Sequence, residues 1–158
     1  DMLINYSTDL GKDRGSLAAM VNASYLTSDQ QTSADARIVQ KAGTLFNPPH
    51  WRARGGLTWS RDGLTLNSTY SLIGGLTDAR TAAAVPVSGM TTLDLTARYR
   101  FAPDKGALAG LELSLSAQNI FNDKPGTIAT SLPYDAGFDS TNYSAVGRLI
   151  SFGIAKSW

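Results

Sequence analysis

The stretch Leu-Glu-Leu-Ser-Leu-Ser-Ala-Gln-Asn, residues 111–119, decides the fold class, because apolar and polar side chains alternate along it without a break. Leu111, Leu113 and Leu115 would share one face of an extended chain, and the polar residues between them would share the other. Successive side chains of a β-strand point to opposite faces, so a period of two predicts a strand with one apolar and one polar face.

The same alternation recurs along the chain and predicts about seven strands. Besides residues 111–119, the alternating segments are residues 2–8, 17–26, 51–60, 64–72, 91–101 and 150–158. The two stretches closest to a helical period of 3.6, residues 35–43 and 77–85, are short and lie between strands, so we predict loops there. The expected fold is an all-β, antiparallel meander.

The composition narrows the class of protein. Of the 158 residues, 31 are Ser or Thr and only 17% are charged, against about 25% in soluble domains. The absence of Cys excludes disulfides and thiol chemistry. A net charge of +1 without a basic cluster argues against a nucleic-acid partner. The longest apolar run, residues 17–21, is far shorter than the roughly 18 residues of a transmembrane helix.

The connections between the expected strands alternate in length. Residues 9–15, 61–63 and 102–110 are short links, whereas residues 28–49, 75–90 and 120–147 are long ones. In a meander every second connection lies at the same end of the sheet, so the long connections gather at one end. Transmembrane β-barrels have this asymmetry, with short periplasmic turns and long extracellular loops. A soluble β-barrel or sandwich is the alternative that strand patterning alone allows.

The side chains on the two faces favour a membrane barrel. The polar faces carry charges that would be costly against lipid, and we expect them to face a polar lumen: Arg52, Arg54, Asp94, Arg98, Arg100 and Glu112. The apolar faces carry aromatic residues near strand ends, where interfacial girdles lie: Trp51, Trp59, Tyr70, Tyr99, Phe101 and Trp158. Asp62-Gly63 is a pair typical of tight hairpins.

Three motifs, in their order and spacing, resemble one family. Residues 119–125 read Asn-Ile-Phe-Asn-Asp-Lys-Pro and look like the motif that ends the penultimate strand of TonB-dependent outer-membrane receptors. Residues 142–148, followed by a final strand with the terminal aromatic Trp158, resemble the C-terminal signature of these receptors. Residues 47–59 resemble a recurrent hairpin strand of their barrels, and the resemblance as a whole extends over about residues 16–158.

The resemblance implies a fold and a cellular location. Receptors of this family close a 22-stranded barrel around a plug domain in the bacterial outer membrane. Residues 1–158 would form the C-terminal part of such a barrel, without the plug and the TonB box. The odd number of seven strands agrees with a fragment, since single-chain bacterial barrels have even strand numbers. The expected partners are outer-membrane lipid, the rest of the barrel and its plug, and TonB through that plug.

The resemblance also implies a transporter and no enzyme. Such receptors actively take up scarce, large nutrients, for example a ferric siderophore, and no cofactor is expected. The last long connection contains the candidates for substrate contact, Tyr134, Phe138 and Tyr143. A small structural or adhesive outer-membrane barrel is the alternative function.

The final strand would carry the signal read by the barrel-assembly machinery. The signal residues that the resemblance implies are Ile150, Phe152, Ile154 and Trp158. Lys156 departs from the apolar pattern, and we expect its ammonium group to reach the periplasmic interface.

Other chemistries stay open as alternatives. The four arginines of the polar faces are either ordinary lumen wall or a basic track for an anionic substrate. Asp135, Asp139 and Asn142 either supply oxygens for Ca²⁺ or belong to a solvated loop. His50 is the single His, without a second His or Cys for a transition-metal site. A hydrolase barrel is not expected, because no G-x-S-x-G pattern occurs.

Overall fold

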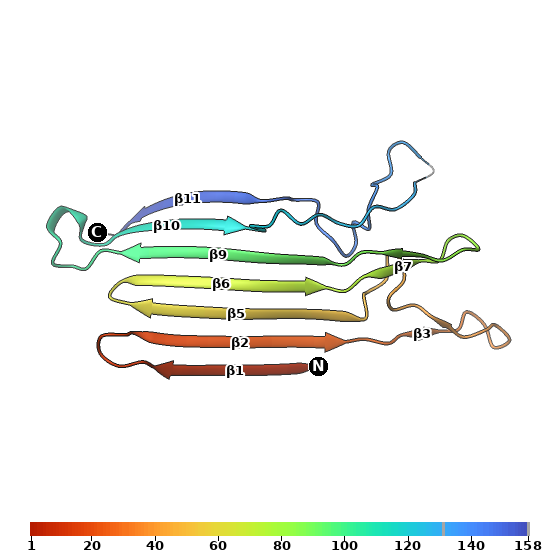
Figure 1. Cartoon of the computed structure of the whole chain (residues 1–158), viewed down its shortest axis with the longest axis horizontal. Helices are drawn as coiled ribbons and strands as arrows, with labels where there is room; N and C mark the ends of the chain where they lie inside the picture. Colours follow the sequence, from red (N-terminus) through yellow and green to blue (C-terminus); the bar gives the residue numbers. More distant parts are fainter. Residues whose placement is uncertain (131, 158) are drawn as a thin grey trace.

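The computed structural model describes residues 1–130 and 132–157. Seven long strands form one antiparallel sheet in the order β1-β2-β5-β6-β9-β10-β11, so each long strand pairs with the next one along the chain (Figure 1). Their bounds are Met2–Asp9 (β1), Ser16–Tyr25 (β2), Trp51–Arg61 (β5), Leu64–Ile73 (β6), Met90–Arg100 (β9), Leu111–Gln118 (β10) and Leu149–Lys156 (β11).

The smaller elements lie in the connections. Two hairpins stand outside the main sheet, β3 (Asp29–Gln30) with β4 (Val39–Gln40), and β7 (Leu76–Asp78) with β8 (Val85–Val87). A single 3₁₀ turn, η1 (Gly106–Leu108), occurs in the part of the chain that the structure describes.

The all-β class and the seven strands expected from the sequence are confirmed. The strands begin and end at almost the expected residues, although β11 ends at Lys156 and Trp158 lies outside the described residues. Neither 35–43 nor 77–85 is helical. The prediction of plain loops was incomplete, because β4 lies within the first of these segments and parts of β7 and β8 lie within the second.

The register brings the apolar sides of the strands to one face of the sheet. A row of directly paired residues crosses the sheet from β2 to β11 through Leu17, Trp59, Leu66, Ala97, Leu115 and Phe152. Directly paired residues of antiparallel strands share a face, and every second residue of each strand follows them. We call the face of this row the apolar face, and its reverse, which carries Arg54, Asp94 and Arg98, the polar face.

The two ends of the sheet differ as the connection lengths predicted. Residues 10–15, 62–63 and 101–110 turn at one end, on the left in Figure 1, and the long connections gather at the other. Asp62 and Gly63 have φ angles of 47° and 83°, the two positive values that a two-residue type I′ hairpin requires. A Cβ at position 63 would also collide with the Arg100 carbonyl oxygen, so only glycine fits this turn.

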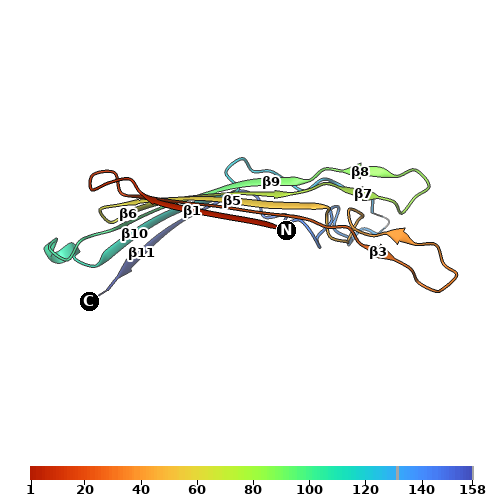
Figure 2. The same cartoon turned by 90° about the horizontal axis from the view of Figure 1, so that it is seen from below.

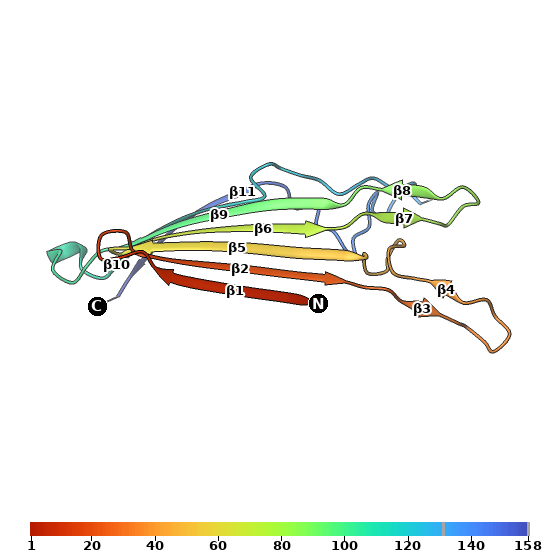
Figure 3. The ribbon, with the colours of Figure 1, turned by 60° about the horizontal axis from the view of Figure 1, so that its bottom comes forward.

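The sheet is a single curved and twisted layer (Figures 2 and 3). Among the described residues, substantial contacts between long strands are confined to neighbours in the sheet, so no second layer packs on it. The buried hydrophobic cluster lies instead at the end with the long connections, where Leu45, Leu76, Val87, Met90 and Tyr143 meet.

Aromatic pairs lie at both ends of the sheet. Tyr25 contacts Trp51 with ring centres 4.8 Å apart at the end with the long connections. Tyr99 meets Phe101 edge to face at 4.9 Å at the other end. Trp51 and Trp59 lie on the same strand, about 26 Å apart at 3.3 Å per residue, a spacing that matches the apolar band of about 25 Å in outer-membrane barrels.

Candidate functional site

Most charged residues of the seven long strands lie on the polar face, and Arg61 and Lys156 at strand ends are the exceptions. Arg54 pairs with Ser71, and Ser71 pairs with Thr92, which brings the charges of β5 and β9 to the same side. The pairing of β9 with β10 adds Glu112. The charged residues of the long strands on this face are Asp9, Arg52, Arg54, Asp94, Arg98, Arg100 and Glu112.

Several of these charges are already engaged. Arg98 Nε lies 3.2 Å from Glu112 Oε1 on the neighbouring strand. Asp94 Oδ1 accepts a hydrogen bond from the backbone N–H of Asn119 at 2.8 Å. Within residues 1–130 and 132–157, no side-chain hydrogen bond or ion pair engages the guanidinium of Arg54 or Arg100.

Arg54 and Arg100 lie at opposite ends of the polar face. Arg54 lies in the same row as Thr92, and Arg100 lies further along β9 near the short connections. Eight residues separate Thr92 from Arg100, about 26 Å along a strand. The unengaged positive charges are therefore two separate points and not one continuous basic track.

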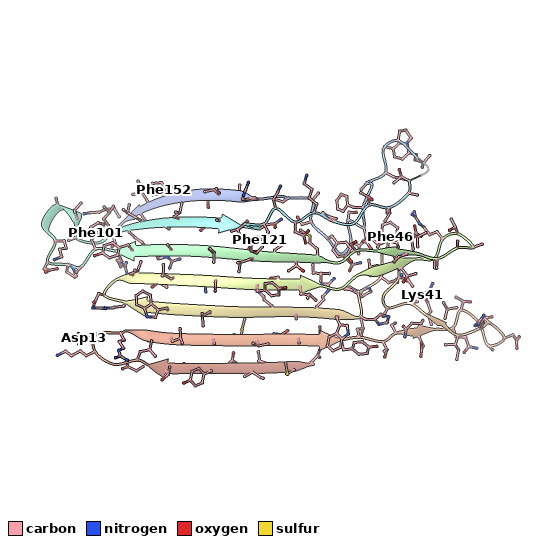
Figure 4. The ribbon with its side chains drawn as sticks, viewed as in Figure 1. Asp13, Lys41, Phe46, Phe101, Phe121 and Phe152 are labelled. Carbon is pink, nitrogen blue, oxygen red and sulfur yellow. The ribbon has the colours of Figure 1, made fainter. Side chains whose placement is uncertain are left out.

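The long connections pack into one unit, which we call the loop cap, residues 26–50, 74–89 and 119–148. The Leu45 N–H donates to the Thr77 carbonyl oxygen at 3.1 Å, and the Thr77 N–H donates to the Gly43 carbonyl oxygen at 2.7 Å. These bonds join the first connection to the second. Figure 4 marks Phe46 in this region, at the opposite end of the molecule from Phe101.

Asp139 joins the third connection of the loop cap to the first. Its side chain is 0% exposed. Oδ2 accepts hydrogen bonds from the Phe46 N–H at 2.7 Å and from Asn142 Nδ2 at 3.0 Å. Oδ1 accepts from the N–H groups of Thr141 at 2.9 Å and Asn142 at 3.1 Å. These four donors offset the cost of burying the carboxylate.

Asn142 extends this network to the sheet. Its Nδ2 also donates to the Asn47 carbonyl oxygen at 2.8 Å, and its Oδ1 accepts from Arg52 Nη2 at 2.8 Å. Arg52 stands near the start of β5 on the polar face. One buried amide of the third connection therefore holds both the first connection and the wall of the sheet.

The aromatic candidates for substrate contact lie in different surroundings. Tyr143 is buried in the hydrophobic cluster, and its hydroxyl donates to the Gly74 carbonyl oxygen at 2.6 Å. Burial, and then the nearby Asp139 carboxylate, raise the pKa of the Tyr143 phenol above its usual 10.0. Phe138 is half-buried against the same cluster, whereas Tyr134 is 80% exposed. Of these three rings, Tyr134 alone projects freely into solvent.

A charged pair ties the second connection to the third. Arg80 donates to the Asp78 carboxylate from Nε at 2.9 Å and from Nη2 at 2.7 Å, and Nη2 also donates to the Ala129 carbonyl oxygen at 2.7 Å. The hydrogen bonds from Arg80 lower the pKa of Asp78 below its usual 3.8. The sequence expectations did not include this pair; its only signal was an acid and an arginine two positions apart.

The Asn-Ile-Phe-Asn-Asp motif, residues 119–123, joins the ends of β9, β10 and β11 by hydrogen bonds. Asn119 and Asn122 adopt φ angles of 46° and 55° just after β10, values that Asn tolerates better than most residues. Asp123 and Asn119 exchange hydrogen bonds of 2.9 Å in both directions. Asp123 Oδ2 accepts from the Thr91 N–H in β9 at 2.7 Å, and Asn122 Oδ1 accepts from the Arg148 N–H before β11 at 3.0 Å. The spacing of the motif follows from these contacts.

Metal ligation has no support among the described residues. They contain no group of three or more His, Asp or Glu side chains arranged to hold a metal ion. Both oxygens of Asp139 accept from N–H donors, and its burial also makes the interpretation as part of a solvated loop wrong. His50 Nδ1 lies 2.8 Å from the Leu26 carbonyl oxygen, and its ring stacks on Tyr25.

No helix in the described part of the chain is both long enough and apolar enough to cross a membrane.

The last strand presents its apolar residues to the outside. Ile150, Phe152 and Ile154 alternate on the apolar face and are largely exposed, and Trp158 lies outside the described residues. Lys156 is on the same face, and its Nζ donates to the Ala107 carbonyl oxygen at 2.8 Å in the short-connection end. Its charge is thereby drawn toward the end of the sheet.

A comparison with protein-family models identifies the fold. The model described as TonB dependent receptor-like, beta-barrel matches residues 4–120, well over half of the chain. The chain belongs to this family. No curated protein and no solved structure gives a match. The matched residues run from β1 to the end of β10.

Family membership gives the sheet its setting. TonB-dependent receptor barrels belong to outer-membrane receptors that act as transporters and not as enzymes. In this family the barrel is associated with a plug domain and with TonB. A sheet with one apolar and one polar face is what a segment of such an outer-membrane barrel requires.

Proposed function

We propose that the protein imports a scarce, large nutrient such as a ferric siderophore across the outer membrane, with energy from TonB. The register of the sheet carries this proposal, because it separates one apolar face from one face of charges and hydroxyls. The long connections at one end supply a surface on which a substrate can be captured. An import barrel needs an apolar face toward lipid, a polar face toward its lumen and a set of long connections at one end.

Residues 1–158 would form the C-terminal wall of a 22-stranded barrel around a plug. The proposed partners are the remaining strands, the plug, TonB through that plug, and outer-membrane lipid. The barrel-assembly machinery would read the final strand through Ile150, Phe152, Ile154 and Trp158.

The polar face serves in this mechanism as a wall for water and plug. Arg98 and Glu112 neutralise each other there, and Arg52 is held by Asn142. Arg54 and Arg100 keep unengaged guanidinium groups, which suit separate hydrogen bonds to plug carbonyl groups or carboxylates. This arrangement favours an ordinary lumen wall over a basic track for the substrate.

Uptake by cells tests the proposal. Cells that express the full-length receptor would be given labelled ferric siderophores, haem, cobalamin and oligosaccharides, with and without TonB. We expect accumulation of one of these substrates that disappears when TonB is deleted. Surface adhesion without TonB-dependent accumulation of any of them would contradict the proposal and support a structural or adhesive barrel.

Substrate contact is proposed for the exposed Tyr134. Replacing this aromatic ring by Ala should weaken substrate binding by the full-length receptor about tenfold, the loss typical of an aromatic anchor. Leu132→Ala is the matched control, because Leu132 is also exposed in the same connection. Equal affinities of Tyr134→Ala and wild type would remove Tyr134 from the set of candidates.

A further inference from the structure

The turn before β5 holds one residue in a backbone conformation that its side chain disfavours. Phe46 has a φ angle of 61°, in the left-handed region. Within residues 1–130 and 132–157, the other non-glycine residues with a positive φ are Asp or Asn, which tolerate it: Asp62, Asn119 and Asn122. A bulky aromatic residue does not, so Gly would fit the backbone of this turn better than Phe46 does.

Hydrogen bonds from the third connection hold this strained turn in place. The Phe46 N–H donates to Asp139 Oδ2 at 2.7 Å, and the Asp139 side chain is fully buried. The carbonyl oxygen of the following residue, Asn47, accepts from Asn142 Nδ2 at 2.8 Å. Asn47 Nδ2 closes the turn by donating to Thr44 Oγ1 at 2.9 Å. Phe46 is therefore fixed before any ligand arrives.

Packing inside the loop cap does not account for the aromatic ring. Phe46 is 49% exposed, whereas the preceding Leu45 is 6% exposed and belongs to the buried hydrophobic cluster. The ring thus leaves half of its surface in water, while its backbone carries a cost that Gly would avoid. Strained residues that the surrounding structure holds firmly are typical of ligand clamps. The ring accordingly suits a contact with something outside the chain.

We propose that Phe46 binds the transported nutrient and packs its ring against a flat apolar part of it, such as an aromatic ring. This assignment rests on the proposed transport function and names a contact within it. The network that fixes Phe46 also holds Arg52 of the polar face, through Asn142 Oδ1. The ring is thereby anchored to the face along which the nutrient would enter. A ring that is fixed before binding loses little conformational entropy when the ligand arrives.

Equilibrium binding to the full-length receptor tests the role of Phe46. The probes are a ferric siderophore with aromatic chelating groups, haem, cobalamin and a neutral oligosaccharide. Phe46→Gly and Phe46→Ala both remove the ring, and each should weaken binding of the compound that wild type binds about tenfold, the loss typical of an aromatic anchor. Phe46→Tyr keeps an aromatic ring and should bind within about twofold of wild type.

The two variants without the ring differ in backbone strain, because Gly adopts a φ of 61° freely and Ala does not. Amides of the loop cap should exchange about fivefold faster in Phe46→Ala than in Phe46→Gly, while both variants bind equally weakly. A purely structural role predicts that the more stable Gly variant binds better. Wild-type affinity of Phe46→Gly would overturn the proposal, and equal exchange in the two variants would remove the strain on which it rests.

Phe121→Gly is the matched control, because Phe121 is an aromatic residue of the loop cap that is 70% exposed and has no positive φ. It should leave the affinity unchanged. An equal loss of affinity in this control would indicate a general effect on the loop cap and overturn the proposal. Binding does not require TonB, so wild type that binds a probe without TonB-dependent accumulation would contradict the transport proposal alone. Wild type that binds none of the four probes would contradict both proposals.

Discussion

The sheet and the loop cap are stabilised in opposite ways. In the sheet, backbone ladders join seven strands while large side chains such as Leu115 and Phe152 remain exposed on the apolar face. In the loop cap, short backbone ladders are few, and buried side chains such as Asp139 and Tyr143 provide the links. The sheet therefore relies on lipid to cover it, whereas the loop cap carries its own core.

This difference corresponds to the different surroundings of the two regions in a membrane barrel, the bilayer around the strands and water around the connections. The strands of a membrane barrel can leave their apolar side chains to the bilayer, because the strands lie within it. The connections outside the bilayer have no lipid to cover their apolar side chains. They need a hydrophobic core of their own to keep a single conformation, which lowers the entropic cost of binding a ligand. Mutations in the two regions should accordingly act independently.

Asp139→Ala should break the loop cap and leave the sheet intact. The substitution leaves four N–H donors without this acceptor, two of them buried and two partly buried. At about 1–3 kcal/mol for an unsatisfied buried group, we expect a loss of about 3 kcal/mol. Hydrogen exchange in the full-length receptor would show this as an increase of about 100-fold at the amides of Phe46 and Thr141. Asp135→Ala, an exposed acid of the same connection, is the control. Unchanged exchange at Phe46 would refute the role given to Asp139.

Gly63→Ala should weaken the sheet and leave the loop cap intact. The substitution combines a left-handed backbone, about 1–2 kcal/mol, with a collision against the Arg100 carbonyl oxygen. Urea unfolding of the receptor in vesicles should show a loss of about 2 kcal/mol. Gly11→Ala controls for the backbone, since Gly11 also has a positive φ but has open space around it. If the two variants lose equal stability, the collision contributes nothing.

Tyr143→Phe should loosen the joint between the two regions. It removes the hydrogen bond to Gly74, worth about 1 kcal/mol. Because burial raises the pKa of Tyr143 in the folded protein, its stabilising effect is complete below pH 10.0 and disappears as the pH rises through the folded value. Wild type should thus show a fall in the protection factors of the loop-cap amides at alkaline pH, after division by the intrinsic base-catalysed exchange rate, that the Phe variant lacks. The same fall in protection factors in both proteins would assign it to another group.

Asp78→Asn should have the smallest effect, confined to acid sensitivity of the loop cap. The pKa of Asp78 is lowered by Arg80, so the pair stabilises the cap above pH 3.8 and fades as the pH falls through the lower folded value. Proteolysis of the cap in the wild-type receptor should rise at that acidity, and the Asn variant should be more sensitive already at neutral pH. Identical pH profiles would show that the Asp78–Arg80 pair does not stabilise the loop cap.

The sequence predicted the sheet well because a local signal specifies it. Alternation within residues 111–119 or 64–72 depends only on neighbouring side chains, and a period of two fixes both the strand and its faces. The lengths of the connections then determined which ends of the strands lie together. The dipeptide Asp62-Gly63 likewise predicted a tight hairpin turn, and both residues have the positive φ angles of that turn.

The loop cap was beyond sequence reasoning because its contacts are long-range. Asp139 looked like a solvated acid, since nothing near it in sequence reveals the Phe46 N–H that it accepts. Arg52 looked like a free lumen charge, since its partner Asn142 lies in a different connection. Tyr134 and Tyr143 could not be distinguished by residue type, and only packing separates the exposed ring from the buried one.

The bond between Asp139 and Phe46 has a consequence for the order of folding. It joins residues 93 positions apart, and the third connection reaches its place only between β10 and β11. Contacts of such long range form late, because the chain between them must first be ordered. We therefore expect the loop cap to close only after the strands between these residues, β5, β6, β9 and β10, have ordered.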